Sequence, residues 1–264
     1  MIEKGRTFLK AAKHKKLVKL EEKHPELLPD QMKKIPPPPY QKDYPKDVEL
    51  IDLVAPKDFT IGQIPLLDAI NRRKSHRGFT KESLTIEELS FLLWVTQGIR
   101  EIKVDHRHGK VETTKRTVPS GGSRHPYETY LLVNRVDGLQ PGIYRYLAIE
   151  HKLYCVKPGE PDFPDRMTEI CGGQTFAGRG AIVFIWALIP YRIEWRYSIV
   201  AHKAAAIEAG HICQNLYLAC EAIGAGTCAI GAYDQKSVDA FIGVDGKDEF
   251  TVYISSVGKI PQRK

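Results

Sequence analysis

The chain has 264 residues and a mass of 29.8 kDa, with 42% hydrophobic and 27% charged residues. This composition excludes collagen, a coiled coil and wholesale disorder, and the length suits one large domain or two small ones. No apolar run reaches the ~18 residues of a membrane span, and the basic N-terminus lacks the apolar core of a secretory signal. We therefore expect a cytoplasmic protein.

Basic residues outnumber acidic residues 39 to 32, and residues 117–264 carry 15 of each sign, so the excess lies in the first 116 residues. Such a bias suits nucleic acid, an anionic membrane or a phosphorylated small molecule. The five cysteines are an odd number and include no CxxC pair. This pattern indicates reduced core thiols rather than disulfides or a zinc site.

Residues 1–59 are predicted to form a basic and proline-rich N-terminal arm. A short helix is expected over Arg6–Leu27. Pro36–Pro39 must be extended, because proline fixes φ and has no N–H to donate. We expect the arm to lie on the domain or on a partner subunit, and a ligand for a proline-reading module is the alternative. The folded domain is expected over residues 60–264.

Helices and strands follow in an order typical of an α+β fold. Helical spacing predicts a helix over Ile61–Ile70, and a capping box of Thr85 and Glu88 begins a second helix that ends at Gly98. A long helix, apolar on most faces, is predicted over 198–223 and a short one over 235–242. Strand patterns occur at 127–134, 142–147, 152–156, 181–189, 227–230 and 249–257. We therefore expect a sheet covered by helices, with the long helix buried in a core or between subunits.

Two segments suit an anionic or planar ligand. Asn71–Arg77 carries four fixed cations and a serine hydroxyl, and arginine can grip a phosphate in bidentate fashion. A solvated basic helix end is the alternative, since cations also suit the helix dipole. In Arg116–Tyr127 two glycines between serines allow close backbone approach, although an ordinary flexible loop fits equally well.

Two later segments also contain candidate site residues. Glu194–Tyr197 is followed by a stretch in which His211 and Asn215, four residues apart, share a helix face. A lone histidine on a buried helix is more often a hydrogen-bonded core residue than a catalyst. Small residues in Gly224–Asp234 allow either close backbone approach to a ligand or a tight packing corner.

Taken together, in this order and spacing, the four segments resemble the nitroreductase superfamily of flavin enzymes. Within it they are most similar to the SagB-type dehydrogenases, whose best-known members oxidise azolines in peptide natural products. The resemblance covers about residues 60–260. It is carried by RRKSHRGF (72–79), LSFLLWVTQGI (89–99), RTVPSGGSRHPYETYLLV (116–133), GLQPGIYRY (138–146), EAGHICQNLYLACEAIGAG (208–226), IGAYD (230–234) and SSVGK (255–259).

The resemblance implies a mixed, mostly antiparallel sheet flanked by helices, and a homodimer with two FMN sites at its interface. It also implies residue roles. The FMN phosphate and ribityl chain would be held by Arg73, Lys74, Ser75 and Arg77. The isoalloxazine edge would lie along Pro119, Ser120, Gly121 and Ser123, often supplied by the partner subunit. Gly231 and Ala232 would approach flavin N5, and Lys259, with Arg263 behind it, would add a phosphate contact. No metal is implied.

The implied mechanism exchanges a hydride at flavin N5, while a proton moves through Arg196 and Tyr197. The azoline-oxidising members typically carry Lys-Tyr at this point. Lysine can act as a base, whereas arginine stays protonated, so Arg196 argues against azoline oxidation by the usual base. Tyr197 remains a candidate proton carrier, and Arg196 could orient an anionic substrate.

The leading hypothesis is an FMN-dependent oxidoreductase that acts on a small molecule or a peptide. It would be either a peptide-modifying dehydrogenase or an NAD(P)H-dependent reductase of nitro or quinone compounds. A basic nucleic-acid-binding protein is the competing class, supported by the N-terminal lysines and Arg72–Arg77 but lacking a recognised motif. A flavin-binding module without turnover is the third hypothesis. We expect a homodimer with no nucleic-acid or membrane partner.

Overall fold

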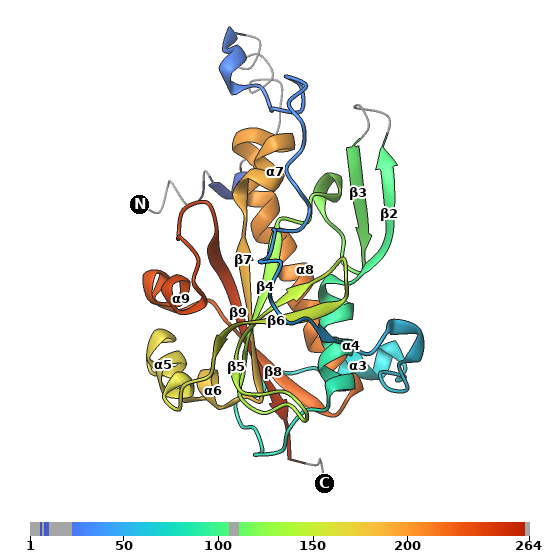
Figure 1. The fold of residues 1–264 in the computed structure, drawn as a ribbon, viewed down its shortest axis with the longest axis vertical. Helices are drawn as coiled ribbons and strands as arrows, with labels where there is room; N and C mark the ends of the chain where they lie inside the picture. The colour runs from blue at the N-terminus through green and yellow to red at the C-terminus, as the bar shows by residue number, and fades with distance from the viewer. Residues whose placement is uncertain (1–5, 7, 11–22, 106–110, 262–264) are drawn as a thin grey trace.

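A seven-stranded sheet runs through the centre of the molecule (Figure 1). The computed structural model describes residues 6, 8–10, 23–105 and 111–261. In spatial order the strands are β1 (Ile51–Asp52), β6 (Lys152–Pro158), β5 (Gly142–Leu147), β4 (Tyr127–Val133), β7 (Ile182–Leu188), β9 (Phe250–Lys259) and β8 (Ala225–Ile230). All six pairings between neighbours are antiparallel. Parallel pairing in the described residues is limited to the isolated bridges Ser75–Thr227 and Leu84–Val136.

Helices cover both faces of this sheet, which confirms the predicted α+β architecture (Figure 1). They are α3 (Leu66–Arg72), α4 (Ile86–Gln97), α5 (Phe163–Ile170), α6 (Thr175–Arg179), α7 (Pro190–Tyr197), α8 (Ala201–Ala222) and α9 (Gln235–Ile242). Short 3-10 turns lie at Pro25–Leu27, Pro56–Asp58, Gly121–Ser123 and Ser198–Val200.

The sheet separates two hydrophobic cores, and the side chains of β4 alternate between them. Leu131 and Val133 pack into the core under α4 and α8, whereas Tyr130 and Leu132 pack into the core under α5, α6 and α9. Successive side chains of a strand point to opposite faces, so a strand that is covered on both faces must be apolar throughout. The continuous apolar run 181–189 is for this reason the interior strand β7, which is fully buried.

The predicted helix over Ile61–Ile70 begins later than expected. Pro65 is its N-cap, and helix α3 starts at Leu66. Gly62 adopts φ +85°, and a Cβ there would lie 2.5 Å from Cε2 of Phe91, so the preceding residues cannot continue the helix. In contrast, the capping box of α4 is confirmed: Glu88 N–H donates to Thr85 Oγ1 at 3.1 Å, and Thr85 N–H donates to Glu88 Oε2 at 2.9 Å.

A separate antiparallel hairpin of β2 (Ile99–Asp105) and β3 (Val111–Arg116) projects beside the main sheet (Figure 1, upper right). This hairpin was not predicted from the sequence. All five cysteines are free, and four of them are buried. None of the helices in the described ranges combines the length and apolar character needed to span a bilayer.

The predicted arm helix over Arg6–Leu27 falls largely outside the described residues. The described part of the arm lies on its own domain. Gln31 N–H donates to Trp195 O at 2.9 Å, and the Trp195 indole N–H donates to Ile35 O at 2.8 Å. The arm also supplies β1, which pairs with β6 at one edge of the sheet.

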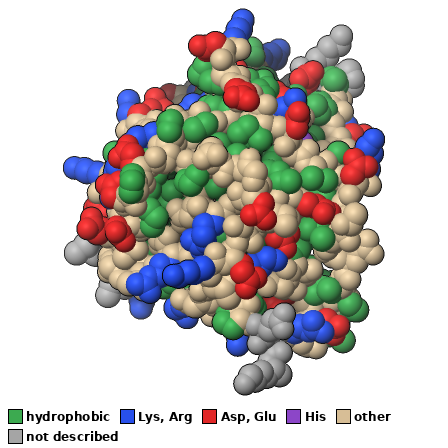
Figure 2. Space-filling model, turned by 60° about the horizontal axis from the view of Figure 1, so that its bottom comes forward, with side chains coloured by type: hydrophobic (Ala, Val, Ile, Leu, Met, Phe, Trp, Pro, Cys, Tyr) green, Lys and Arg blue, Asp and Glu red, His purple; other side chains and the backbone are tan. Residues whose placement is uncertain are grey.

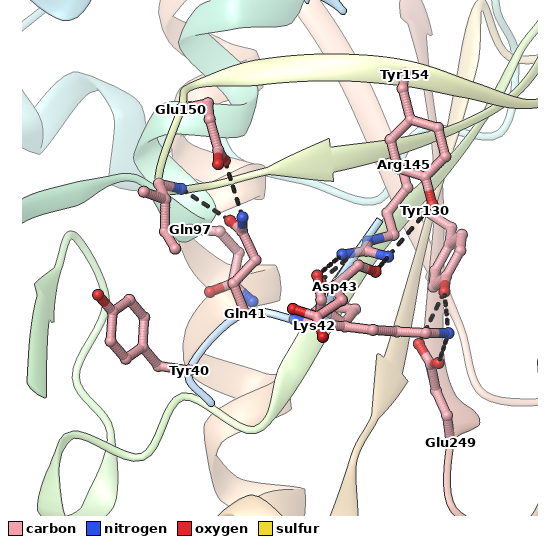
Figure 3. Close-up of polar contacts among 12 residues, drawn as sticks. Tyr40, Gln41, Lys42, Asp43, Gln97, Tyr130, Arg145, Glu150, Tyr154 and Glu249 are labelled. Carbon is pink, nitrogen blue, oxygen red and sulfur yellow. Dashed lines mark hydrogen bonds and ion pairs between the residues drawn. The ribbon is translucent and has the colours of Figure 1, made fainter. Parts of the chain in front are cut away.

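A buried polar network fixes residues 40–44 of the arm (Figure 3). The Arg145 guanidinium donates to the backbone carbonyls of Lys42 and Asp43, and Lys42 forms an ion pair with Glu249. Lys42 N–H donates to Glu128 Oε1 at 2.8 Å. Burial opposes ionisation of Glu128, but the guanidiniums of Arg192 and Arg145 outweigh it and keep its pKa below the usual value.

Candidate functional site

The basic turn after α3 lies at the junction of α8 and β8. Arg73 N–H donates to Ala69 O at 3.0 Å, and its guanidinium carbon lies 5.4 Å from the centroid of the Tyr217 ring. Ser75 Oγ lies 3.0 Å from Tyr217 Oη, and Ser75 forms a parallel bridge with Thr227 of β8. The turn is therefore fixed against the free edge of the sheet.

Two arginines of this turn lack an acidic partner. The Arg77 guanidinium carbon lies 5.6 Å from the centroid of the Phe176 ring, and Lys74 is exposed. Over the described ranges no carboxylate forms an ion pair with Arg73 or Arg77. Two unneutralised guanidiniums beside the Ser75 hydroxyl form a donor set that suits a phosphate.

The end of the same edge strand is open. Gly231 and Ala232 follow β8 and are exposed, and a Cβ added at Gly231 would meet nothing within 4 Å. Ala232 O accepts a hydrogen bond from Gln174 Nε2 at 3.4 Å. A flat ligand could thus approach the backbone here without meeting a side chain.

Lys259, the last residue of β9, pairs with Ala225 at the start of β8, the end of the strand away from Gly231. Its ammonium group forms an ion pair with Glu88 and donates to Ile223 O at 3.3 Å. The pair links the end of β9 to the N-terminal capping box of α4 and to the end of α8. Arg263 lies outside the described residues.

The loop of Pro119–Ser123 packs against α7 and α8 of the same chain. Gly121 N–H donates to Glu208 Oε1 at 2.7 Å, and Ser120 Oγ accepts a hydrogen bond from His125 N at 2.8 Å. Gly122 has φ +60°, and a Cβ there would lie 2.5 Å from Arg196 Nε. The second glycine is therefore required by the close approach of Arg196.

Arg196 and Tyr197 end helix α7, with the Arg196 guanidinium carbon 5.8 Å from the centroid of the Tyr197 ring. The next residue, Ser198, has φ 47° and ψ −133°, a conformation that is ordinarily reserved for glycine. Ser198 Oγ donates to Leu27 O of the arm at 3.0 Å. The arm therefore holds the sharp turn that sets the direction of Tyr197.

Glu208 is a functional candidate that the sequence analysis did not select. Its residue is 5% exposed, and burial raises its pKa to about 7, while hydrogen bonds from Gly121 and Ser120 act in the opposite direction. Within the described chain no cation lies within ion-pair distance of it. The available signal was an acidic residue on the inward face of an otherwise apolar helix.

The expectation for His211 as a core residue is wrong. The uncovered face of α8 carries His211, which is exposed together with Ile207, Gly210 and Gln214. Its helix neighbour Asn215 has the structural role instead, since Asn215 Nδ2 donates to Val95 O of α4 at 2.7 Å. The long helix is buried where it packs against the sheet, α3, α4 and α7, and it is exposed at these positions.

The predicted residues form two separate groups. One lies along β8 and contains the basic turn and Gly231–Ala232; the other contains the Pro119–Ser123 loop, Arg196, Tyr197 and Glu208. The first group contacts α8 at Tyr217, and the second contacts it at Glu208. These two residues are nine positions apart, which corresponds to two and a half helical turns and about 13 Å along the axis. They project from opposite sides of the helix, and none of the contacts in the described part joins the groups.

The β8 group fits the FMN that the resemblance implies. Unpaired guanidiniums and a hydroxyl are available for the phosphate at Arg73, Ser75 and Arg77. An open stretch of backbone follows on the same edge strand at Gly231. The phosphate donors and the open backbone therefore lie along one edge strand, in the order that a phosphate followed by a planar ring would need.

Three comparisons with known proteins point to the same family. The family model described as "Nitroreductase family" matches residues 70–259. A nitroreductase-type protein of Methanocaldococcus jannaschii is 27% identical over 199 residues, covering 75% of this chain and 93% of that protein. A nitroreductase structure from Anabaena variabilis superimposes with a TM-score of 0.64 and 21% identity over 82% of this chain, which spans only 42% of that longer chain.

A chain of the McbBCD microcin synthetase complex of E. coli, solved with truncated pro-MccB17 bound, superimposes with a TM-score of 0.58 and 18% identity. The match covers 97% of both chains. Because the family model spans most of the chain, including both groups of candidate site residues, the protein is an oxidoreductase that belongs to the nitroreductase family.

Proposed function

We propose that this protein is an FMN-dependent oxidoreductase that exchanges a hydride with a small-molecule or peptide substrate, similar to the SagB-type dehydrogenases. The observation that carries the proposal is the β8 edge, where unpaired Arg73 and Arg77 precede the open backbone of Gly231. Bound FMN would supply the hydride chemistry at N5. Arg73, Ser75 and Arg77 would hold its phosphate, and the Gly231–Ala232 backbone would face its ring.

The second group supplies the proton. Tyr197 Oη and Glu208 Oε1 both lie within 3.5 Å of one point, the Cβ position at Gly121. Burial raises the pKa of Glu208 to about 7, so this carboxyl group can bind or release a proton near neutral pH. Arg196 stays protonated and cannot act as the base. We assign the proton transfer to Tyr197, with Glu208 as the group that takes the proton from it or returns it.

A homodimer would unite the two groups. They lie on opposite sides of α8, so a second copy could place its Pro119–Ser123 loop and Tyr197 over the first copy's β8 edge. The α3 helix supports this arrangement, because Leu66 and Leu67 are 66% and 67% exposed and Ile70 is also exposed. Exposed apolar side chains of this kind often mark an interface.

The test of function is the visible spectrum of the purified protein, repeated with NADH and NADPH in the absence of oxygen. A flavin spectrum that bleaches favours the nitro or quinone reductase, whereas a flavin indifferent to both nicotinamides favours a dehydrogenase reduced by its substrate. A colourless protein that does not take up FMN would exclude the proposal. The fold likeness to the microcin synthetase chain makes peptides a reasonable first substrate class for the indifferent case.

Mixed dimers test the composite site. Arg73→Ala/Arg77→Ala subunits and Tyr197→Phe subunits are each expected to be inactive. If each site takes its basic turn from one subunit and its tyrosine from the other, a mixed dimer regains one intact site. If both parts come from one subunit, mixing restores nothing.

Nucleic-acid binding has little support on the visible surface. On the face shown in Figure 2, Lys and Arg side chains form one short patch with Asp and Glu groups on either side, and no basic stripe crosses the face. A protein that grips a phosphate backbone normally presents such a stripe.

A further inference from the structure

The environment of Tyr197 contains a buried arginine with unused donors. Arg124 is 2% exposed, and its Nε and Nη1 atoms have no hydrogen-bond partner. Its guanidinium carbon lies 5.0 Å from the centroid of the Trp195 ring of α7, a cation–π contact. A buried donor without an acceptor costs free energy, so an arginine in this state is a strong sign of a missing anionic ligand.

A second arginine lies beside it. Arg196 approaches Gly122 so closely that no side chain fits there, and across the described residues its guanidinium makes no hydrogen bond or ion pair. Burial, together with the nearby charges of Arg196 and Arg192, lowers the pKa of Arg124 to about 10. The two free guanidiniums therefore repel each other and would both gain from an anion between them.

The neighbouring carboxylates do not neutralise this pair. Glu128 forms ion pairs with Arg192 at 2.6 Å and with Arg145 at 3.4 Å. The Glu194 carboxylate lies 2.6 Å from Nε2 of His202. Glu208 accepts from Gly121 N–H. Within the described chain no carboxylate therefore forms an ion pair with Arg124 or Arg196.

We propose that Arg124 and Arg196 form an anion-binding subsite beside Tyr197, and that the substrate of this oxidoreductase carries a carboxylate. The planar fork of arginine matches a carboxylate in bidentate geometry, and the contact with the Trp195 ring holds the Arg124 guanidinium beside α7. This subsite is distinct from the phosphate set of Arg73 and Arg77, which lies along β8. The inference rests on the proposed function, because it assigns a substrate class to the same site.

The experiment compares two compounds that differ only in charge, 4-nitrobenzoate and 4-nitrobenzamide. Calorimetric titration of the flavin-loaded protein measures their affinities, and reduction of each compound is followed separately. We expect the carboxylate to bind about tenfold more tightly than the amide, because a charge-assisted bidentate contact is lost in the amide. Acetyl-diglycine with a free or an amidated C-terminus, used as a competitor, distinguishes a peptide carboxylate from a small-molecule one.

Arg196→Gln should reduce the preference for the carboxylate to near unity and leave the bound flavin unchanged. Arg196→Lys should keep part of the preference, since it retains the charge and loses the fork. Arg179→Gln, which alters an exposed arginine of α6, is the matched control and should keep the full preference.

Equal affinity for the two compounds, binding of neither, or a preference that survives Arg196→Gln would each overturn the subsite. The comparison in the unaltered protein does not depend on any variant folding correctly. Failure to bind or reduce flavin is detected in the spectrum and counts against the proposed function, whereas the calorimetric preference tests the subsite separately.

Discussion

Gly121 donates its backbone N–H to Glu208 Oε1 at 2.7 Å, and this contact ties a glycine-rich loop to a buried carboxyl group of α8. Glu208 is buried and has no cation partner in the described chain, so its negative charge is removed mainly by protonation. The Gly121 contact therefore places the loop next to a carboxyl group whose charge changes with pH.

The stability of the protein should fall between pH 4.5 and 7 through Glu208. Burial raises the pKa of its carboxyl group from 4.5 to about 7, so the native state keeps a proton that the unfolded state has already released. The stabilisation is complete below pH 4.5 and is lost as the pH rises through 7, up to about 3 kcal/mol. Glu208→Gln cannot ionise and should lack this decline.

Urea unfolding at pH 5 and pH 8 measures the effect, and Glu82→Gln, an exposed change, is the control. The difference in stability between the native protein and Glu208→Gln should change with pH, whereas that for Glu82→Gln should not. A constant difference would show that Glu208 titrates normally.

Removal of the basic turn should abolish flavin retention. Arg73→Ala together with Arg77→Ala deletes two charge-assisted contacts, which corresponds to an affinity loss of at least about a hundredfold. Flavin absorbance per chain after gel filtration measures retention, with Arg179→Ala as the control. Retention at the native stoichiometry would exclude these residues from the phosphate site.

The Arg196→Lys variant should change turnover without changing flavin binding, because Arg196 lies with Tyr197 on the side of α8 away from the basic turn. Lysine can lose its proton when desolvated, so the pH dependence of kcat should also shift. Turnover and its pH profile are measured on protein with a full flavin content. A variant that loses flavin would assign the segment a structural role.

Gly122→Ala should destabilise the protein through two separable effects. A side chain at φ +60° costs about 1 kcal/mol, and the new Cβ would collide with Arg196. In an Arg196→Ala background only the backbone cost should remain. Urea unfolding of the two single variants and the double variant gives the coupling between the sites, and a coupling of zero would mean that Arg196 moves away freely.

The core of this fold could be predicted because its signals are local. The capping box of Thr85 and Glu88 and the run 181–189 each specify their own structure. The β2–β3 hairpin was missed although Ile102 and Val104 alternate with charged residues, a strand pattern that the sequence analysis left unused. Helix α7 begins at Pro190, a common first helical residue, and that signal was also overlooked.

The second group of site residues was harder to predict because it depends on contacts between distant segments. Glu208 becomes notable only when burial and the Gly121 contact are known. Arg124 reads as one more loop cation until its burial and its unpaired nitrogens are seen. The motif alone identified Arg196 and Tyr197, but it gave no indication that the arm fixes the turn after them at Ser198.

The polar attachment of the arm has a consequence for the folding of the whole chain. Arg116 donates to Tyr40 O, and Arg145 donates to the carbonyls of Lys42 and Asp43, so two buried guanidiniums use the arm's backbone as their acceptor. A chain that began at Thr60 would leave both charges in the interior without those acceptors, at a cost of several kcal/mol. We therefore expect residues 40–44 to unfold together with the sheet as one cooperative unit. Proteases should cleave this segment only after the entire molecule has unfolded.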